Sequence, residues 1–278
     1  MTTIAKPQGY MRLQDLAGPP AGNETLTLDW LAGTWRHTDP EPHGICETRI
    51  ASAGDALMVE CVGFGGPLPR HSPPVRANTI FAANPSSRDG VGFFADFKFD
   101  GMSSRFQGNV NLGLLVLAGF HDFNDGSARS NYFSREFFYS VSGESASLPS
   151  SNISLQGSGS GRLDVSSLVG LWRNTTSAST GIVTIQIREE REGLAVRSFG
   201  AGKTSLVDWG ETSAKVYAKD WVSTEAMAFY ACFDAGELSC HLQANVKQGV
   251  LVVAYFTVFN DGSGRSNYFS REFYYKDK

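Results

Sequence analysis

Two fifteen-residue segments of the chain are nearly identical. Residues 123–137 read FNDGSARSNYFSREF and residues 259–273 read FNDGSGRSNYFSREF, so they differ only at Ala128 and Gly264. Chance does not produce such a match, and the chain therefore contains a tandem duplication. The length of 278 residues is near the size at which one hydrophobic core divides into two, which agrees with two domains.

Further matches upstream extend the repeat and fix its boundaries. LAGTWR at 31–36 aligns with LVGLWR at 168–173, and QGNV at 107–110 aligns with QANV at 243–246. A segment rich in Ser and Gly separates the copies and is typical of a flexible linker. The predicted organisation is an N-terminal extension at 1–28, repeat 1 at 29–140, a linker at 141–163 and repeat 2 at 164–278.

Each repeat is predicted to contain about eight β-strands. GIVTIQIR at 181–188 alternates with period two, short turns such as NDGSGR at 260–265 join the strands, and no amphipathic helix is evident. Sequential hairpins in this number favour closure, because a closed barrel has no exposed sheet edge. The predicted fold class is all-β, with two tandem eight-stranded antiparallel up-and-down β-barrels; a flat β-sandwich is the alternative. We expect the extension at 1–28 to lie over one barrel mouth.

A G-x-W motif opens each repeat, GTW at 33–35 and GLW at 170–172. The motif resembles that of the calycin superfamily, which includes lipocalins and fatty-acid-binding proteins. The resemblance implies that Trp35 and Trp172 close one barrel end, and that an arginine from a late strand packs across each of them. Arg135 and Arg271 stand on the last strand of each repeat, where that arginine is expected. The lipocalin disulfide pattern is absent.

The two arginines have two interpretations. One is structural: the guanidinium stacks on the tryptophan and caps the barrel. The other is a clamp for a ligand carboxylate, because fatty-acid-binding proteins carry an R-x-Y pair on the last strand and this chain has R-x-F-x-Y at 271–275. If Trp172 and Arg271 point inward, Phe269, Phe273 and Tyr275 share the inner face.

Polar residues two apart on single strands form a second set of candidates. Gln107 and Asn109, like Gln243 and Asn245, lie on one face of their strand. They are interpreted either as polar groups that orient a ligand in an apolar cavity or as an outer face in contact with water.

Positions at which the copies differ are a third source of candidates. His121 aligns with Thr257, Asp96 with Cys232 and Arg105 with His241. His121 alternates with Leu117 and Gly119, so an inward histidine with a near-neutral pKa would suit proton transfer. A hydrogen-bonded structural histidine is the alternative.

Other features exclude several classes of function. His37, Asp39 and His43 match no metal-site spacing, so no metal is predicted. A net charge of −4 without a basic run argues against nucleic-acid binding. No apolar stretch is long enough for a membrane span and the first residues do not resemble a secretory signal, which predicts a cytoplasmic protein with four free, mostly buried cysteines. No phosphate loop, dinucleotide motif or nucleophile elbow is present, so no cofactor is expected.

These observations predict a protein that binds a small, largely apolar metabolite in a barrel cavity and acts as a cofactor-independent cyclase or isomerase of specialised metabolism. The activity rests on analogy with paired calycin-like proteins. The alternatives are a carrier without turnover and an interaction protein with filled barrels. Strands that are apolar on both faces, such as residues 250–259, predict that the two barrels pack together through their last strands or that the chain forms a homodimer. The candidate catalytic residues are His121 and Arg135; the candidate ligand contacts are Trp35, Gln107, Asn109, Trp172, His241, Gln243, Asn245, Tyr255, Arg271 and Tyr275.

Overall fold

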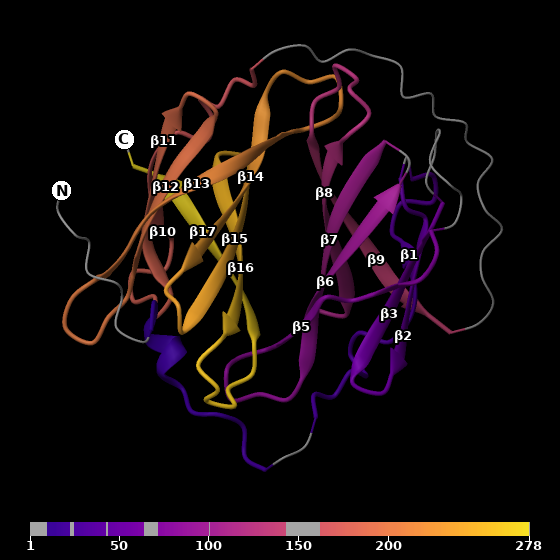
Figure 1. The fold of residues 1–278 in the computed structure, drawn as a ribbon, viewed down its shortest axis with the longest axis horizontal. Coiled ribbons are helices and arrows are strands. Elements are labelled where there is room, and N and C mark those ends of the chain that lie inside the picture. Colours follow the sequence, from indigo (N-terminus) through magenta and orange to yellow (C-terminus); the bar gives the residue numbers. More distant parts are fainter. Residues whose placement is uncertain are drawn as a thin grey trace.

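The computed structural model describes residues 10–22, 25–42, 44–63, 72–99, 101–142 and 162–277. The fold is all-β, as predicted (Figure 1). Within the described residues there are seventeen strands and one short 3-10 helix, η1 (Leu13–Leu16). No helix in this part of the chain has the length and apolar character needed to cross a bilayer.

Nine strands come from repeat 1 and eight from repeat 2, among the residues that the structure describes. Those of repeat 1 are β1 (Gly33–His37), β2 (Glu47–Ala53), β3 (Ala56–Val62), β4 (Val75–Arg76), β5 (Thr79–Ala82), β6 (Gly90–Phe99), β7 (Met102–Asn111), β8 (Leu114–Phe123) and β9 (Tyr132–Val141). Those of repeat 2 are β10 (Gly170–Asn174), β11 (Ile182–Glu190), β12 (Gly193–Gly200), β13 (Val207–Ala218), β14 (Ala226–Asp234), β15 (Leu238–Lys247), β16 (Val250–Phe259) and β17 (Tyr268–Lys276).

Strand pairing follows the order of the chain within each repeat. In repeat 2 every strand from β10 to β17 pairs antiparallel with the next, and β17 returns to pair with β10. In repeat 1 the first strand, β1, pairs with both β2 and β9. Two parallel bridges, Ala82 to Tyr268 and Tyr132 to Ala218, join the repeats, so all strands belong to one mixed sheet.

The register of β10 on β17 decides which residues of repeat 2 point inward. Trp172 is opposite Lys276, so the even-numbered residues of β17 share its face. Tyr274 is fully buried with Trp172 in the core, whereas Phe273 and Tyr275 are each 47% exposed. The expectation that Arg271, Phe269, Phe273 and Tyr275 line the interior with Trp172 is therefore wrong.

Outward residues of the central strands pack between the two repeats. Phe120 and Phe133 of repeat 1 contact Tyr217 and Ala228 of repeat 2. At the equivalent position Phe81 and Phe94 of repeat 1 form a cluster with Phe256 and other outward residues of repeat 2. In Figure 1 β7 and β8 face β15 and β16 across the middle of the molecule. We call this buried surface the inter-repeat face.

Candidate functional site

The two tryptophans of the G-x-W motifs lie inside their repeats. The indole nitrogen of Trp35 donates to the carbonyl of Leu31 at 2.9 Å, and that of Trp172 donates to Leu168 at 2.8 Å. The cation over Trp172 is Lys276, with its ammonium 5.6 Å from the ring centroid. Both side chains are packed as structural residues of the core.

Arg135 and Arg271 point away from the tryptophans, onto the inter-repeat face. The Arg271 guanidinium donates from Nη2 to Asn109 Oδ1 at 2.7 Å and lies 5.5 Å from the Phe269 ring. Arg135 lies 5.4 Å from Phe133 in the same way. A cap over the tryptophan and a carboxylate clamp inside a barrel are both excluded, because the strand register places these residues on the outer side of β9 and β17.

The polar residues of β7 and β15 lie in an environment that neither interpretation anticipated. Gln107, Asn109, Gln243 and Asn245 face outward from their own repeat, yet each is at most 3% exposed because the other repeat covers it. They neither line a barrel cavity nor contact bulk water. Sequence periodicity gives the face of a strand but not what covers that face.

The interior of repeat 1 contains a cluster of polar side chains, which we call the cup of repeat 1. Its members are Ser104, His121, Tyr132, Ser134 and Glu136. His121 is inward, as predicted. Its Nδ1 is 2.8 Å from Ser104 Oγ and its Nε2 is 3.0 Å from Ser134 Oγ. Burial lowers the pKa of His121 to about 3, so the imidazole is neutral at neutral pH. Both ring nitrogens are engaged, which favours the structural interpretation over proton transfer.

Glu136 is the member of this cup that the sequence analysis missed. Burial raises the pKa of its carboxyl to about 7, and the Oε2 atom has no hydrogen-bond partner among the described residues. The equivalent Glu272 accepts from Ser179, the amide of Ile182 and Tyr274. Repeat 1 has Pro42 and Phe138 where repeat 2 has Ser179 and Tyr274, so both hydroxyl donors are lost.

The equivalent cup of repeat 2, formed by Cys240, Thr257, Tyr268, Ser270 and Glu272, is filled by the N-terminal extension. Arg12 is fully buried and donates to Ser270 Oγ at 3.1 Å, to Tyr268 Oη at 2.6 Å and to Thr257. Its guanidinium also lies 5.2 Å from the ring of Tyr255.

Buried groups around Arg12 hold the extension in place. Asp15 accepts from the amides of Met11 and Arg12 and from Tyr268 Oη, and Trp209 donates to the Met11 carbonyl at 2.7 Å. Tyr255 bonds the hydroxyl of Tyr274 at 2.5 Å and belongs to this packed interior. The interior of repeat 2 around Tyr255 is therefore occupied by the chain itself.

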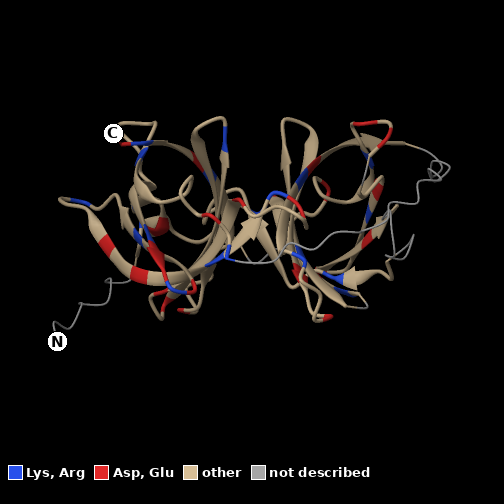
Figure 2. Ribbon diagram, turned by 90° about the horizontal axis from the view of Figure 1, so that it is seen from above, with Lys and Arg blue, Asp and Glu red and all other residues tan. Residues whose placement is uncertain are grey.

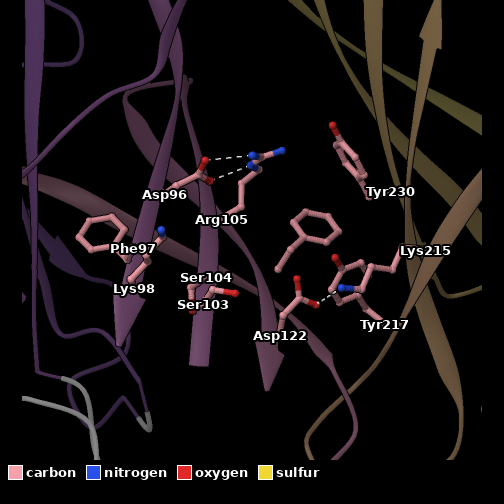
Figure 3. A pocket seen from close by; sticks show the side chains of 11 residues that line it. Asp96, Phe97, Lys98, Ser103, Ser104, Arg105, Asp122, Lys215, Tyr217 and Tyr230 are labelled. Carbon is pink, nitrogen blue, oxygen red and sulfur yellow. Dashed lines mark hydrogen bonds and ion pairs between the residues drawn. The ribbon is translucent and has the colours of Figure 1, made fainter. Parts of the chain in front are cut away.

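A groove of about 360 Å³ opens between the repeats and contains the most varied chemistry of the molecule (Figure 3). We call it the inter-repeat groove. Arg105 pairs with Asp96 through two bonds of 2.7 and 2.9 Å, and Lys215 pairs with Asp122 at 2.6 Å. The aromatic ring of Phe120 also lines the groove and packs edge-on against Tyr217, with ring centroids 4.9 Å apart.

Tyr230 completes the groove and connects it to His241. The Tyr230 hydroxyl lies 2.6 Å from His241 Nδ1, and the Arg105 guanidinium is 5.8 Å from the Tyr230 ring. Burial raises the pKa of Tyr230, while burial and then the charge of Arg105 lower the pKa of His241. A neutral imidazole beside a protonated phenol forms a hydrogen-bonded pair through which a proton can move.

The groove is built from positions at which the two copies have diverged. The second opening between the repeats, of about 650 Å³, has Val258 where the groove has Asp122. The aligned partners of Asp96 and Arg105 are Cys232 and His241. Asp96 and Arg105, two positions at which the copies differ, line this groove. Lys215, Tyr217 and Tyr230 were missed because only the packing of the two repeats brings them to it.

The cysteines and the histidines of the first loop are the remaining candidates. The four cysteines are free, with Cys46, Cys61 and Cys240 buried and Cys232 partly exposed. His37 Nδ1 accepts from the amide of Asp39 at 2.9 Å, and His43 lies outside the described residues. The described residues contain no group of three or more side chains that could hold a metal ion.

Comparisons with known proteins identify no relative. No protein-family model, no curated protein and no solved structure matches this chain.

Proposed function

We propose that each repeat is a calycin-like β-barrel, and that the pair binds a small, largely apolar metabolite in the inter-repeat groove and isomerises or cyclises it without a cofactor. The ring of antiparallel pairings from β10 back to β10 supports the barrel assignment. So does the way the strands of each repeat curve around a separate centre in the view from above (Figure 2). We place the ligand between the barrels because Arg12 and large aromatic side chains fill repeat 2.

The shape and lining of the groove support this ligand class. A volume of about 360 Å³ lies in the range of small-molecule sites. Phe120 and Tyr217 offer an apolar surface, and the two ion pairs place polar groups at its ends. The favoured ligand has an apolar ring or chain with an oxygen-bearing group near Arg105 and Tyr230. Lys and Arg are interspersed with Asp and Glu along the ribbons of both repeats (Figure 2).

The Tyr230–His241 pair is the observation that carries the catalytic part of the proposal. With the hydrogen of Nδ1 donated to Tyr230 Oη, the phenol hydrogen of Tyr230 is free to polarise or protonate a ligand oxygen. The hydrogen bond from neutral His241 then stabilises the tyrosinate, and the ligand returns a proton to Tyr230 when it loses one from another of its atoms. No redox partner is needed for an isomerisation of this kind.

The test is mass spectrometry of an apolar extract of the source organism before and after incubation with the purified protein. A compound that keeps its mass but changes retention time supports turnover. Tyr230→Phe should then lower the rate at least tenfold without weakening binding, whereas the control Tyr217→Phe, on the neighbouring strand of the same wall, should lower it less. If no compound changes and none is retained, the proposal is wrong.

A carrier without turnover is the second candidate. Asp96 neutralises Arg105 and Asp122 neutralises Lys215 within the free groove, so these charges need no ligand to satisfy them. A compound retained unchanged would support this candidate. Replacing Asp122 by Val, the residue of the equivalent position, should then weaken retention.

A further inference from the structure

Arg135 and Arg271 are retained in both repeats and line one small cavity at the centre of the inter-repeat face. The cavity is lined further by Gln107, Asn109 and Gln243 and by alanine and phenylalanine side chains, with no carboxylate. Its volume is about 10 Å³, close to the space of one water molecule. This cavity shares Phe120 with the inter-repeat groove but none of its polar residues, and it has no part in the function proposed above.

The side chains around the cavity have more hydrogen-bond donors than partners. Among the described residues, Nε of both arginines, Nε2 of Gln107 and of Gln243 and Nδ2 of Asn109 are buried without a partner. One acceptor of the lining, Gln107 Oε1, is also without a partner, and a half-turn of this amide presents its NH₂ group instead. Such a concentration of donors is the chemistry that surrounds bound anions.

Two guanidinium groups next to one cavity also leave positive charge without compensation. Burial and the charge of Arg271 lower the pKa of Arg135 to about 10, and burial lowers that of Arg271. An arginine side chain keeps its charge in proteins, and the rings of Phe133 and Phe269 offset only part of the cost of burying the two guanidinium groups. A neighbouring anion would remove both the desolvation penalty and the mutual repulsion.

We propose that this cavity, the anion pocket, binds one small monovalent anion of the size of chloride between Arg135 and Arg271. The bond from Arg271 to Asn109 crosses between the repeats and holds one guanidinium in place for this role. The cavity is too small for a metabolite carboxylate or for phosphate. The anion acts as a counter-ion that joins the repeats, which accounts for the retention of the same arginine and amide residues in both copies.

The experiment is thermal unfolding of the full chain at constant ionic strength, with sodium gluconate replaced stepwise by sodium chloride or bromide. The wild-type Tm should rise by about 3–6 °C and saturate, as expected for a ligand that binds only the folded state. Arg135→Leu and Arg271→Leu should each abolish this chloride-dependent rise. The control Arg173→Leu removes an exposed arginine paired with Asp277 and should retain the full response.

Two outcomes would overturn the proposal: a wild-type Tm that is the same in gluconate and chloride, or a chloride response that survives in both leucine variants. If neither variant folds, crystals of the wild type grown in bromide decide the matter. An anomalous bromide peak between the two guanidinium groups would support the anion pocket, and its absence from well-ordered crystals would rule the pocket out.

Discussion

The cups of repeats 1 and 2 are formed by equivalent positions of the two copies and are filled in different ways. In repeat 1 the strand itself provides the filling group: His121 bonds Ser134. In repeat 2 the equivalent serine, Ser270, accepts from Arg12, which arrives from the N-terminal extension. The equivalent serines of the two last strands, Ser134 and Ser270, thus each form a hydrogen bond with a side-chain nitrogen, and the two nitrogens come from unrelated parts of the chain.

Two sequence differences that compensate for one another explain why the two cups are filled by different side chains. Repeat 1 has Gly119 and His121 where repeat 2 has Tyr255 and Thr257. A Cβ atom on Gly119 would lie 2.5 Å from His121 Nε2, so the imidazole fits only over a glycine. In repeat 2 Tyr255 fills that place, and the small Thr257 leaves room for the guanidinium. Replacing Gly119 alone by the tyrosine of repeat 2 would therefore place a side chain against His121.

The largest expected effect comes from removing Asp15, the carboxylate that pairs with Arg12 in the cup of repeat 2. This fully buried carboxylate lies 3.5 Å from the Arg12 guanidinium and bonds Tyr268. Asp15→Ala leaves a buried cation without its partner and should lower the free energy of unfolding by about 3–5 kcal/mol. Urea unfolding measures this loss. Asp55→Ala, which removes an exposed carboxylate, is the control and should change stability by less than about 0.5 kcal/mol; equal losses in the two variants would contradict the role of Asp15.

The effect of His121, which fills the cup of repeat 1, should appear in the pH dependence of stability. The pKa of His121 is about 3 in the folded protein, below the usual 6.5, so the unfolded chain binds the extra proton between these values. The stability contributed by neutral His121 is complete above pH 6.5 and is lost as the pH falls toward 3. Between pH 7 and pH 4 the free energy of unfolding should fall by about 3 kcal/mol more in the wild type than in the His121→Gln variant. Chemical unfolding of both proteins across this range is the measurement, and parallel curves would disprove the assignment.

The same substitution should act in opposite directions on the two glutamates. The pKa of Glu136 is about 7, above the usual 4.5. As the pH rises through this interval the carboxyl loses its proton more readily in the unfolded chain, so the free energy of unfolding falls. Glu136→Gln should therefore stabilise the protein by about 1–2 kcal/mol at pH 8 and have little effect at pH 4. Glu272→Gln weakens three hydrogen bonds and should destabilise by about 1–3 kcal/mol. Effects of the same sign at pH 8 would show that the two cups are electrostatically alike.

Local patterns predicted the strands and the repeat, but not the partners of each face. Period-two alternation and the turn residues are written along the chain, so the all-β fold and an inward His121 could be read directly. The orientation of Arg271 depended on one register, Trp172 opposite Lys276, which no local pattern specifies. The sequence analysis placed the odd-numbered residues of β17 on the inner face, whereas the even-numbered ones lie there, so it assigned Arg271 and Tyr275 to the wrong face.

Long-range packing accounts for the rest of what the sequence did not reveal. Gln107 and Gln243 point outward from their own repeat and are covered by the other repeat. The sequence analysis had considered only a ligand cavity or a face in contact with water. Tyr230 lies on the inter-repeat groove only because β14 of one repeat packs near β7 of the other. Arg12 carries no motif at all, and its insertion into repeat 2 depends on a cup whose residues lie more than 200 positions away.

The smallest expected effect concerns a hairpin that both repeats share. The turn between β7 and β8 holds Leu112 at φ 50°, and the turn between β15 and β16 holds Gln248 at φ 52°. Both residues precede a glycine of positive φ, Gly113 and Gly249, in a turn where asparagine is favoured. Leu112 is 96% exposed and makes no packing contribution that would offset this strain. Leu112→Asn and Gln248→Asn should each raise stability by about 0.5–1 kcal/mol. Equal gains in thermal unfolding would mean that the hairpins kept the same backbone while the cups diverged, whereas a gain at only one would extend the difference between the repeats to their turns.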